Sequence, residues 1–433
     1  MLNWDDPLAA PAPAPASSKP AAKPVERELH PEANPLQAEK NAVAEEAPTY
    51  AEEAAAPTKD AKAGAPIVDD TAVAPRPEVV TALSGLEAEK HGQPMHVPDL
   101  KPVNVDDKRV INGMTDVNQL APFKYPWAWE YFLNANRNHW TPLDINMNQD
   151  VHDYHHKLTL EERHVYENVL AYLTTSDILA MRNIGLAVME KMSAPELQIY
   201  QARQVYEESL HTWTYQHCIE SIGLDQGEIY NRYRVVPEIN GKIQIANRRL
   251  SSVLRPDIDL RDRDELHNFL MAYIFFAGVF EGCWFYNGFS PIFALQRRGL
   301  MKGTAEQLQY IMRDEVLHAS FGIRVAKQIM AEENITPDPK AIKLMWEECE
   351  AAETAYAGYL LKDPILGYSK EDHVGQYRFI ANRRAKSLGL EAPYPGAEAT
   401  LPWLDEQANL RKEKNFFETR VTEYQTGGAL KWD

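Results

Sequence analysis

The spacing Glu-x-x-His occurs twice within apolar helical sequence, and it restricts the folds that are open to this 433-residue chain. Glu208 precedes His211 by three residues, and Glu315 precedes His318 by three. On a helix, residues three apart project from one face, so each pair can bind one metal ion together. Tyr215, four residues after His211, lies on the face of the first pair. The sequence therefore predicts two helices that each present a carboxylate and an imidazole.

Four acids occupy positions whose neighbours on the same helix face are apolar: Asp177, Glu208, Glu281 and Glu315. An unpaired carboxylate is costly in such surroundings, so each must be neutralised, paired or bound to a metal. For any one of them, a buried acid paired with an arginine or a tyrosine is an equally good explanation. Four acids and two histidines on four separate apolar faces make that explanation much weaker, and they favour a metal site.

The charge and the donor atoms of this set agree with two metal ions. Four carboxylates balance two divalent cations, and two neutral imidazoles complete a mixed oxygen and nitrogen set. Without thiolates, the set favours iron or manganese over zinc. Two Glu-x-x-His pairs, each with a further carboxylate from another helix, are typical of ferritin-like bundles. The predicted fold is all-α, a ferritin-like di-metal-carboxylate helical bundle.

Other pairs share the spacing but lack the apolar surroundings. They lie at expected helix starts or among charged residues, where a solvated first turn is the better interpretation. These pairs are Glu161 with His164, Asp153 with His156, and Asp264 with His267. We do not expect them to bind metal.

Capping signals divide the chain into long helices. Thr159-Leu-Glu-Glu162 is a capping box that begins a helix to about Met192. Strand-like alternation is scarce, and a polar connection with two prolines is predicted between residues 236 and 256. Further helices are predicted over residues 193–223, 264–298 and 304–333, and from the caps at 338–339 and 369–372.

Composition divides the chain into three parts. Residues 1–105 are rich in Ala, Pro, Glu and Lys and hold about half of the 29 prolines, so they offer little apolar surface to offset the entropy of ordering. We expect a disordered extension there and a helical domain over residues 106–403. Residues 404–433 are charged and without periodicity, which predicts a flexible tail.

The overall charge and the cysteines limit the class of protein. A net charge of −18 argues against a nucleic-acid-binding surface. Three cysteines without C-x-x-C spacing favour a reducing cytoplasm, and no signal peptide is recognised. Residues 275–295 are apolar enough to suggest a membrane span, but Glu281 within them argues for a buried helix of a soluble bundle.

The order of these residues closely resembles the small, radical-generating subunit of class I ribonucleotide reductase. The intervals resemble that family: 31 residues from Asp177 to Glu208 and 34 from Glu281 to Glu315. The resemblance covers residues from about 125 to 433. It implies two metal sites, one formed by Asp177, Glu208 and His211 and the other by Glu281, Glu315 and His318.

The resemblance also implies which residue is oxidised. Tyr215 would carry a stable tyrosyl radical, in a pocket that is matched here by Phe285, Phe289 and Ile311. The Asp at position 177 and the Tyr at position 215 resemble the tyrosyl-radical type, and not the variant that has Glu and Phe there.

A route for radical transfer and a partner follow from the same resemblance. The route is matched by Trp140, Asp314 and Tyr424, with Glu418 upstream of Tyr424. The chain would be the small subunit of a ribonucleoside-diphosphate reductase, active only with the large catalytic subunit, to which the tail 404–433 would dock. We expect two iron ions per chain, with manganese as the alternative, and a cytoplasmic homodimer.

The residues alone leave two other classes open. One is a ferritin-like oxidase, monooxygenase or desaturase that acts alone on a small molecule. The other is an iron-storage or structural bundle, which would have no use for Tyr215 or for a mobile tail. The long N-terminal segment departs from the short-headed members of the resembled family, and nothing in it resembles an ATP-binding regulatory cone.

Overall fold

The computed structural model describes residues 104–404, apart from 115–119, 121, 256, 363 and 366. The predicted extension 1–105 and the predicted tail 404–433, with Tyr424 and Glu418, lie almost wholly outside these residues, so the division of the chain into three parts stays a prediction. The α-helices are α1 (Pro126–Ala135), α2 (Asn148–His156), α3 (Leu160–Asn183), α4 (Pro195–Ile222), α5 (Gln226–Val235), α6 (Pro237–Ser251), α7 (Arg263–Ile274), α8 (Tyr286–Arg297), α9 (Lys302–Glu332), α10 (Pro339–Leu360) and α11 (Lys370–Leu388).

Short helical segments of other types join these helices. They are the 3₁₀ turns η1 (Val105–Asp107), η2 (Pro142–Asp144) and η4 (Met189–Lys191), and the π-helices η3 (Ile184–Val188) and η5 (Phe275–Phe285). The described residues contain no strand, as the all-α prediction requires.

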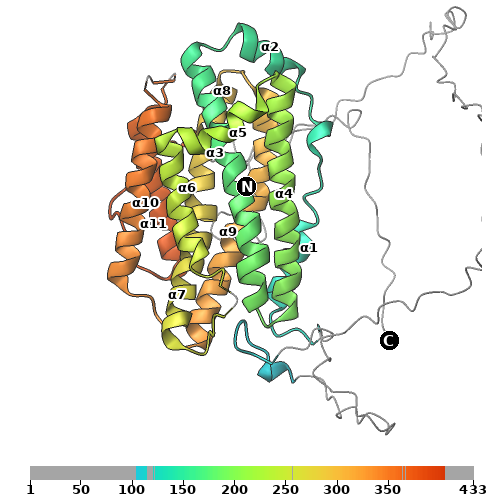
Figure 1. Cartoon of the computed structure of the whole chain (residues 1–433), viewed down its shortest axis with the longest axis vertical. Helices are drawn as coiled ribbons and strands as arrows, with labels where there is room; N and C mark the ends of the chain where they lie inside the picture. The colour runs from blue at the N-terminus through green and yellow to red at the C-terminus, as the bar shows by residue number, and fades with distance from the viewer. Residues whose placement is uncertain are drawn as a thin grey trace, which may run out of the picture. The chain divides into compact units, whose positions relative to one another are not determined.

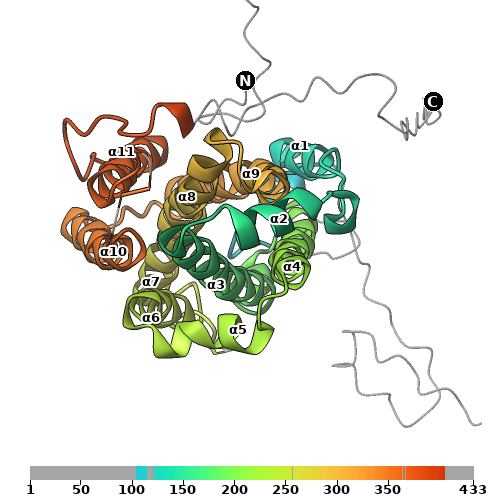
Figure 2. The same ribbon diagram turned by 90° about the horizontal axis from the view of Figure 1, so that it is seen from above.

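The long helices form a bundle around a shared interior (Figures 1 and 2). Helix α3 packs against α4, and η5 packs against α9, so these four segments face one another. Helix α1 lies against α4 and α9, while α10 and α11 pack together on another side of the bundle. The four segments are the ones on which the predicted metal ligands lie.

The helix starts are set partly by local and partly by tertiary contacts. The predicted capping box at Thr159 and Glu162 is confirmed, with both reciprocal hydrogen bonds present. The cap predicted at the start of α9 is wrong, because α9 begins at Lys302 and its first turn is bound by Asp150 of α2. The Asp150 carboxylate accepts hydrogen bonds from the backbone N–H groups of Gly303 and Thr304, at 2.8 and 2.6 Å.

Two further expectations are corrected or extended. The connection predicted between residues 236 and 256 is mostly helix, because Pro237 occupies the first turn of α6, where a proline is tolerated. The helix that carries the first Glu-x-x-His pair ends as predicted at Gly223, which adopts a left-handed conformation with φ of 80°.

The central segment of the bundle is a buried π-helix. All eleven residues of η5, Glu281 among them, are buried, and α7, η5 and α8 form one helical run. This run, Arg263–Arg297, is long and apolar enough to cross a membrane, but 94% of its most apolar window is buried inside the structure. It is therefore the core helix that the position of Glu281 predicts. A π-helix widens the turn and is common at functional sites.

Candidate metal centre

The structure brings all six predicted ligands together at the centre of the bundle. Each side chain is at most 1% exposed. Four different segments contribute them, in agreement with the sequence: α3 carries Asp177, α4 carries Glu208 and His211, η5 carries Glu281, and α9 carries Glu315 and His318.

The six residues form two overlapping groups, each with its donor atoms within 4.8 Å of one another. Glu208 and Glu315 belong to both groups, while Asp177 and His211 complete one group and Glu281 and His318 complete the other. The resemblance divides the residues three and three. The geometry adds that two glutamates lie where a carboxylate could bridge two ions.

Both imidazoles present Nδ1 to this cluster. His211 Nδ1 lies 3.2 Å from Asp177 Oδ1 and 3.3 Å from Glu315 Oε1. His318 Nδ1 lies 3.1 Å from Glu208 Oε1 and 3.5 Å from Glu315 Oε2. A ring nitrogen and several carboxylate oxygens therefore converge in each half of the centre.

The donor atoms fit a pair of cations. Both carboxylate oxygens of Glu208, Glu281 and Glu315 are buried without a hydrogen-bond partner, as are Asp177 Oδ2 and His318 Nδ1. Buried oxygens of this kind are costly unless a cation or a donor satisfies them. Nitrogen and oxygen donors in this number suit two divalent transition-metal ions.

The electrostatics of the centre point the same way. Burial, and then the charge of Glu208, raises the pKa of Glu281 well above its ordinary value. Burial also raises the pKa of Asp177 well above its ordinary value. At Glu315 burial has the same tendency, but the nearby imidazoles of His211 and His318 outweigh it and lower the pKa. Metal ions would supply positive charge between these carboxylates, in place of the protons that burial favours on Asp177 and Glu281.

The far nitrogen of each imidazole is held by an acid next to a ligand. His211 Nε2 lies 3.2 Å from Asp314 Oδ2, and His318 Nε2 lies 2.9 Å from Glu207 Oε2. Such acids fix the ring orientation and leave Nδ1 free to bind a metal. Arg203 donates to the other oxygen of Glu207 at 2.8 Å. Sequence reasoning missed Glu207, although it precedes Glu208 as Asp314 precedes Glu315.

Tyr215 is enclosed beside the centre. Its side chain is 0% exposed, and its hydroxyl has no hydrogen-bond partner. Burial, and next the Asp177 carboxylate, raises the pKa of Tyr215 well above its ordinary value, so the phenol keeps its proton. Phe285, Phe289 and Ile311, which the resemblance places around it, are fully buried as well.

Trp140 contacts Tyr310, which lies one helical turn before Asp314 on α9. Its indole stacks on Tyr310, with ring centroids 5.3 Å apart and planes inclined by 18°. Asn138 connects the two positions, because its Nδ2 donates to the Tyr310 carbonyl at 3.1 Å and to Asp314 Oδ1 at 2.6 Å. No hydrogen bond joins Trp140 to Asp314, since the indole N–H has no partner. Sequence reasoning did not identify Tyr310.

The three pairs that the sequence sets aside belong to neither metal group found in the described part of the chain. His164 Nε2 lies 3.0 Å from the carbonyl of Tyr359, and Asp153 forms an ion pair with Lys157 at 2.8 Å. Ordinary hydrogen bonding and ion pairing therefore account for His164 and Asp153.

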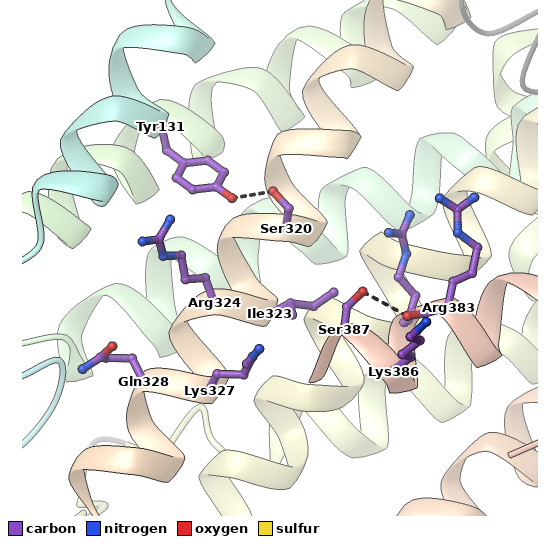
Figure 3. A pocket seen from close by; sticks show the side chains of 10 residues that line it. Tyr131, Ser320, Ile323, Arg324, Lys327, Gln328, Arg383, Lys386 and Ser387 are labelled. Carbon is purple, nitrogen blue, oxygen red and sulfur yellow. Dashed lines mark hydrogen bonds between the residues drawn. The ribbon is translucent and has the colours of Figure 1, made fainter. Parts of the chain in front are cut away.

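A surface pocket between α9 and α11 is separate from the metal centre (Figure 3). It has a volume of about 850 Å³ and contains none of the six ligands. At one end, the Tyr131 hydroxyl and Ser320 Oγ are 2.6 Å apart. Basic side chains dominate its wall, among them Arg324, Lys327 and Lys386. The predicted ligands therefore lie in the closed interior and not along this pocket.

A helical bundle that encloses two carboxylate and histidine groups on four helical segments is a ferritin-like di-metal-carboxylate protein. Residues 117–402 match the family model of the ribonucleotide reductase small chain. The chain belongs to this family. It is a small subunit of ribonucleoside-diphosphate reductase, an oxidoreductase.

Similar proteins cover most of the chain. It is 38% identical over 339 residues to the ribonucleoside-diphosphate reductase subunit beta of Chlamydia pneumoniae. That alignment spans 77% of this chain and 97% of the Chlamydia protein. The chain is 30% identical over 315 residues to the small subunit of Dictyostelium discoideum, spanning 72% and 87%. Membership of this family rules out the two alternative classes, an oxidase that acts alone and an iron-storage or structural bundle.

Solved structures support the fold. The ribonucleotide reductase R2 subunit from Clostridium botulinum matches with a TM-score of 0.62 at 23% identity, covering 70% of this chain and 95% of that one. The dimanganese(II) NrdF of Streptococcus sanguinis matches with a TM-score of 0.55 at 18% identity, covering 67% and 98%. The predicted ferritin-like bundle is therefore confirmed.

Proposed function

We propose that the six clustered residues bind two metal ions and that Tyr215 is the residue oxidised to a stable radical. The observation that carries this proposal is a buried phenol without a hydrogen-bond partner, whose pKa is raised by burial and then by the carboxylates of the centre. When bound, the metal pair supplies the oxidising power that it draws from dioxygen. The protein's part is to hold Tyr215 within reach and to keep water and reductants away.

The side chains around Tyr215 suit that part. The phenol must lose a proton together with its electron, and a nearby base is needed to accept it. Among the charged groups, Asp177 has the largest effect on the pKa of Tyr215, and its Oδ2 has no hydrogen-bond partner. We assign Asp177 Oδ2 as the proton acceptor. Because Phe285 and Phe289 are fully buried, the neutral radical that remains is protected from solvent.

The radical is proposed to leave through His211, Asp314 and Trp140. The 3.2 Å contact between His211 and Asp314 supplies the first part of this route. The stacked pair of Trp140 and Tyr310, one turn from Asp314, supplies the second. Tyr424 would continue the route toward the large subunit, and it lies outside the described residues.

Iron is the metal that we propose for the centre, at two ions per chain. The nitrogen and oxygen donors exclude neither iron nor manganese, and the Streptococcus structure named above is a dimanganese(II) protein. The deciding experiment is to load the metal-free protein with Fe(II) or with Mn(II), expose each sample to air, and measure ribonucleotide reduction with the large subunit. Iron-loaded protein is expected to support turnover without an added activating protein, and inactivity of the iron form against activity of the manganese form would reverse the assignment.

A small subunit works with a large one, and we propose that the C-terminal residues make the contact. Residues Gly427-Gly428 would act as a hinge, and the segment from Ala429 to Asp433 carries one large aromatic residue, Trp432. A short peptide with one large aromatic residue is a suitable anchor for a groove on a partner. We also propose that the chain forms a homodimer and acts in the cytoplasm, in keeping with three buried free cysteines.

A further inference from the structure

A buried ammonium group lies against three aromatic rings near the metal centre. Lys242 of α6 is 0% exposed, and its Nζ forms an ion pair with Glu353 Oε2 at 2.5 Å. The same Nζ lies 3.8 Å from the ring centroid of Tyr172, 4.7 Å from that of Tyr356 and 4.8 Å from that of Trp284. A lysine is rarely buried so completely, and one ion pair does not require three rings around it.

Two of these rings are close along the chain to proposed metal ligands. Trp284 follows Glu281 by three residues on η5, and Tyr172 precedes Asp177 by five residues on α3. Neither the Tyr172 hydroxyl nor the Trp284 indole N–H has a carboxylate or imidazole hydrogen-bond partner. Each ring is therefore close along its helix to a proposed ligand and has no carboxylate or imidazole to accept its proton.

The missing base determines what oxidation of these rings would produce. One electron would pass from the ring to a one-electron oxidant, here the metal pair after its reaction with dioxygen, and the oxidant would be reduced by one electron. Because no proton leaves, the ring becomes a radical cation. An ammonium group that attracts the neutral ring repels this product, and the repulsion is strong in a buried site.

We propose that Lys242 is a positioning residue for the radical, because its charge prevents oxidation of Tyr172, Trp284 and Tyr356 and so confines oxidation to Tyr215. The benefit of preventing this oxidation rests on the proposed function, in which Tyr215 is the residue that carries the radical. The electrostatic effect of Lys242 on the three rings does not depend on that role and can be measured separately.

The counter-charge of Lys242 has other partners besides the lysine. Glu353 also lies 2.6 Å from His373 Nε2 through Oε1, and Asn287 Nδ2 donates to that oxygen at 2.8 Å. The carboxylate charge is therefore shared among three partners, while the ammonium lies directly over the rings. These partners also make Lys242 replaceable, because Glu353 keeps two of them when the lysine is changed.

The first test uses the metal-free full-length protein with Lys242→Met, which is unbranched and only one atom shorter, and Lys242→Arg, which keeps the charge. A photogenerated ruthenium(III) complex serves as the one-electron oxidant, and peptide mass spectrometry locates the oxidised residues. We expect oxidation of Trp284 and Tyr172 to rise several-fold in the Met variant and to stay at the wild-type level in the Arg variant. Lys343→Met on the exposed face of α10 is the matched control. Equal oxidation in wild type and Lys242→Met would overturn the proposal.

The second test uses iron-loaded protein exposed to dioxygen. Electron paramagnetic resonance of Lys242→Met is expected to show signals from rings other than Tyr215, with a lower yield of the Tyr215 radical. If wild type forms no radical at Tyr215, the proposed function fails, and the metal-free measurement still decides the role of Lys242.

A second variant covers the case in which Lys242→Met does not fold. Tyr172→Phe removes only a hydroxyl that has no hydrogen-bond partner. If Lys242 keeps Tyr172 out of the reaction, this variant forms the Tyr215 radical in wild-type yield. A changed yield would mean that Tyr172 is oxidised in the native protein, which contradicts the proposal: a higher yield if Tyr172 competes with Tyr215, a lower one if it passes the electron on.

Discussion

Oε2 of Glu207 lies 2.9 Å from Nε2 of His318, although the two residues are 111 positions apart in the chain. Asp314 makes the corresponding contact with His211 in the other half of the centre. Each acid directly precedes a glutamate of the cluster on its own helix and contacts the histidine on the other. The two Glu-x-x-His helices therefore orient each other's imidazoles.

This contact predicts a selective loss of metal. Glu207→Gln keeps the size of the side chain but removes the charge that orients His318, so the affinity of that half of the centre should fall about 10- to 100-fold. Metal titration of the metal-free variant would show one weakened ion and one normal ion. Glu220→Gln, at an exposed position of the same helix, is the control. Two ions bound with wild-type affinity would show that Glu207 does not orient the ligand.

The two overlapping groups predict unequal effects of removing the ligands. Glu208 and Glu315 belong to both groups, so replacing either with Ala should weaken both ions. Asp177 and Glu281 each belong to one group, and their Ala variants should retain about one ion per chain. Elemental analysis after gel filtration measures the difference.

The same four variants should remain folded without metal. Each substitution removes a buried carboxylate that depends on protons or cations for compensation, so the metal-free variants should be no less stable to urea than metal-free wild type. Full occupancy by two ions in Glu208→Ala, Glu281→Ala and Glu315→Ala would contradict the assignment of the centre.

Glu353, a buried acid outside the metal centre, should make the stability of the protein depend on pH. Burial disfavours the ionised form of Glu353, but Lys242 and His373 outweigh it and lower its pKa from 4.5 to about 2. A depressed pKa in the folded state stabilises the protein above the unfolded value, and this contribution disappears as the pH falls through the folded value. Glu353→Gln should therefore be less stable than wild type near neutral pH by about 3 kcal/mol.

The difference in stability between wild type and Glu353→Gln should shrink as the pH falls. As the pH falls from 4.5 toward 2, wild type should lose the contribution of Glu353 and the two proteins should converge. Urea unfolding of both metal-free proteins at several pH values measures this. A stability difference that stays constant over that range would mean that Glu353 does not ionise as described.

The C-terminal segment can be tested by deletion. Removing residues 426–433 should abolish ribonucleotide reduction with the large subunit, while the metal content and the radical signal remain as in wild type. Tyr424→Phe should instead bind the large subunit normally and lose turnover, because a redox-active phenol is needed there. Undiminished activity of the deletion variant would refute the docking role.

The sequence predicts the six ligands because the position of a residue in a helix determines the face from which its side chain projects. Residues three apart must share a face, and acids on apolar faces need compensation, so Glu208, His211, Glu315 and His318 follow from local rules. The start of α3 at Thr159 is equally local, since a capping box lies within one turn.

Features that depend on tertiary partners could not be predicted in this way. Asp150 caps α9 from another helix, and Glu207 contacts a histidine 111 residues away, so neither has a signal in its own neighbourhood. The aromatic surroundings of Lys242 could be found only from the structure, because the three rings around its ammonium group come from three other segments. The π-helix around Glu281 has no distinct spacing in the sequence, since its residues are apolar on every face.

Tyr215→Phe provides the most direct test of the account. The lost hydroxyl has no hydrogen-bond partner, so stability should change by less than about 1 kcal/mol and both metal ions should remain bound. Electron paramagnetic resonance after loading with Fe(II) and dioxygen should show a stable tyrosyl signal in wild type, altered by ring-deuterated tyrosine, and none in the variant. An unchanged signal in Tyr215→Phe would contradict the account and make Tyr286 the next residue to examine.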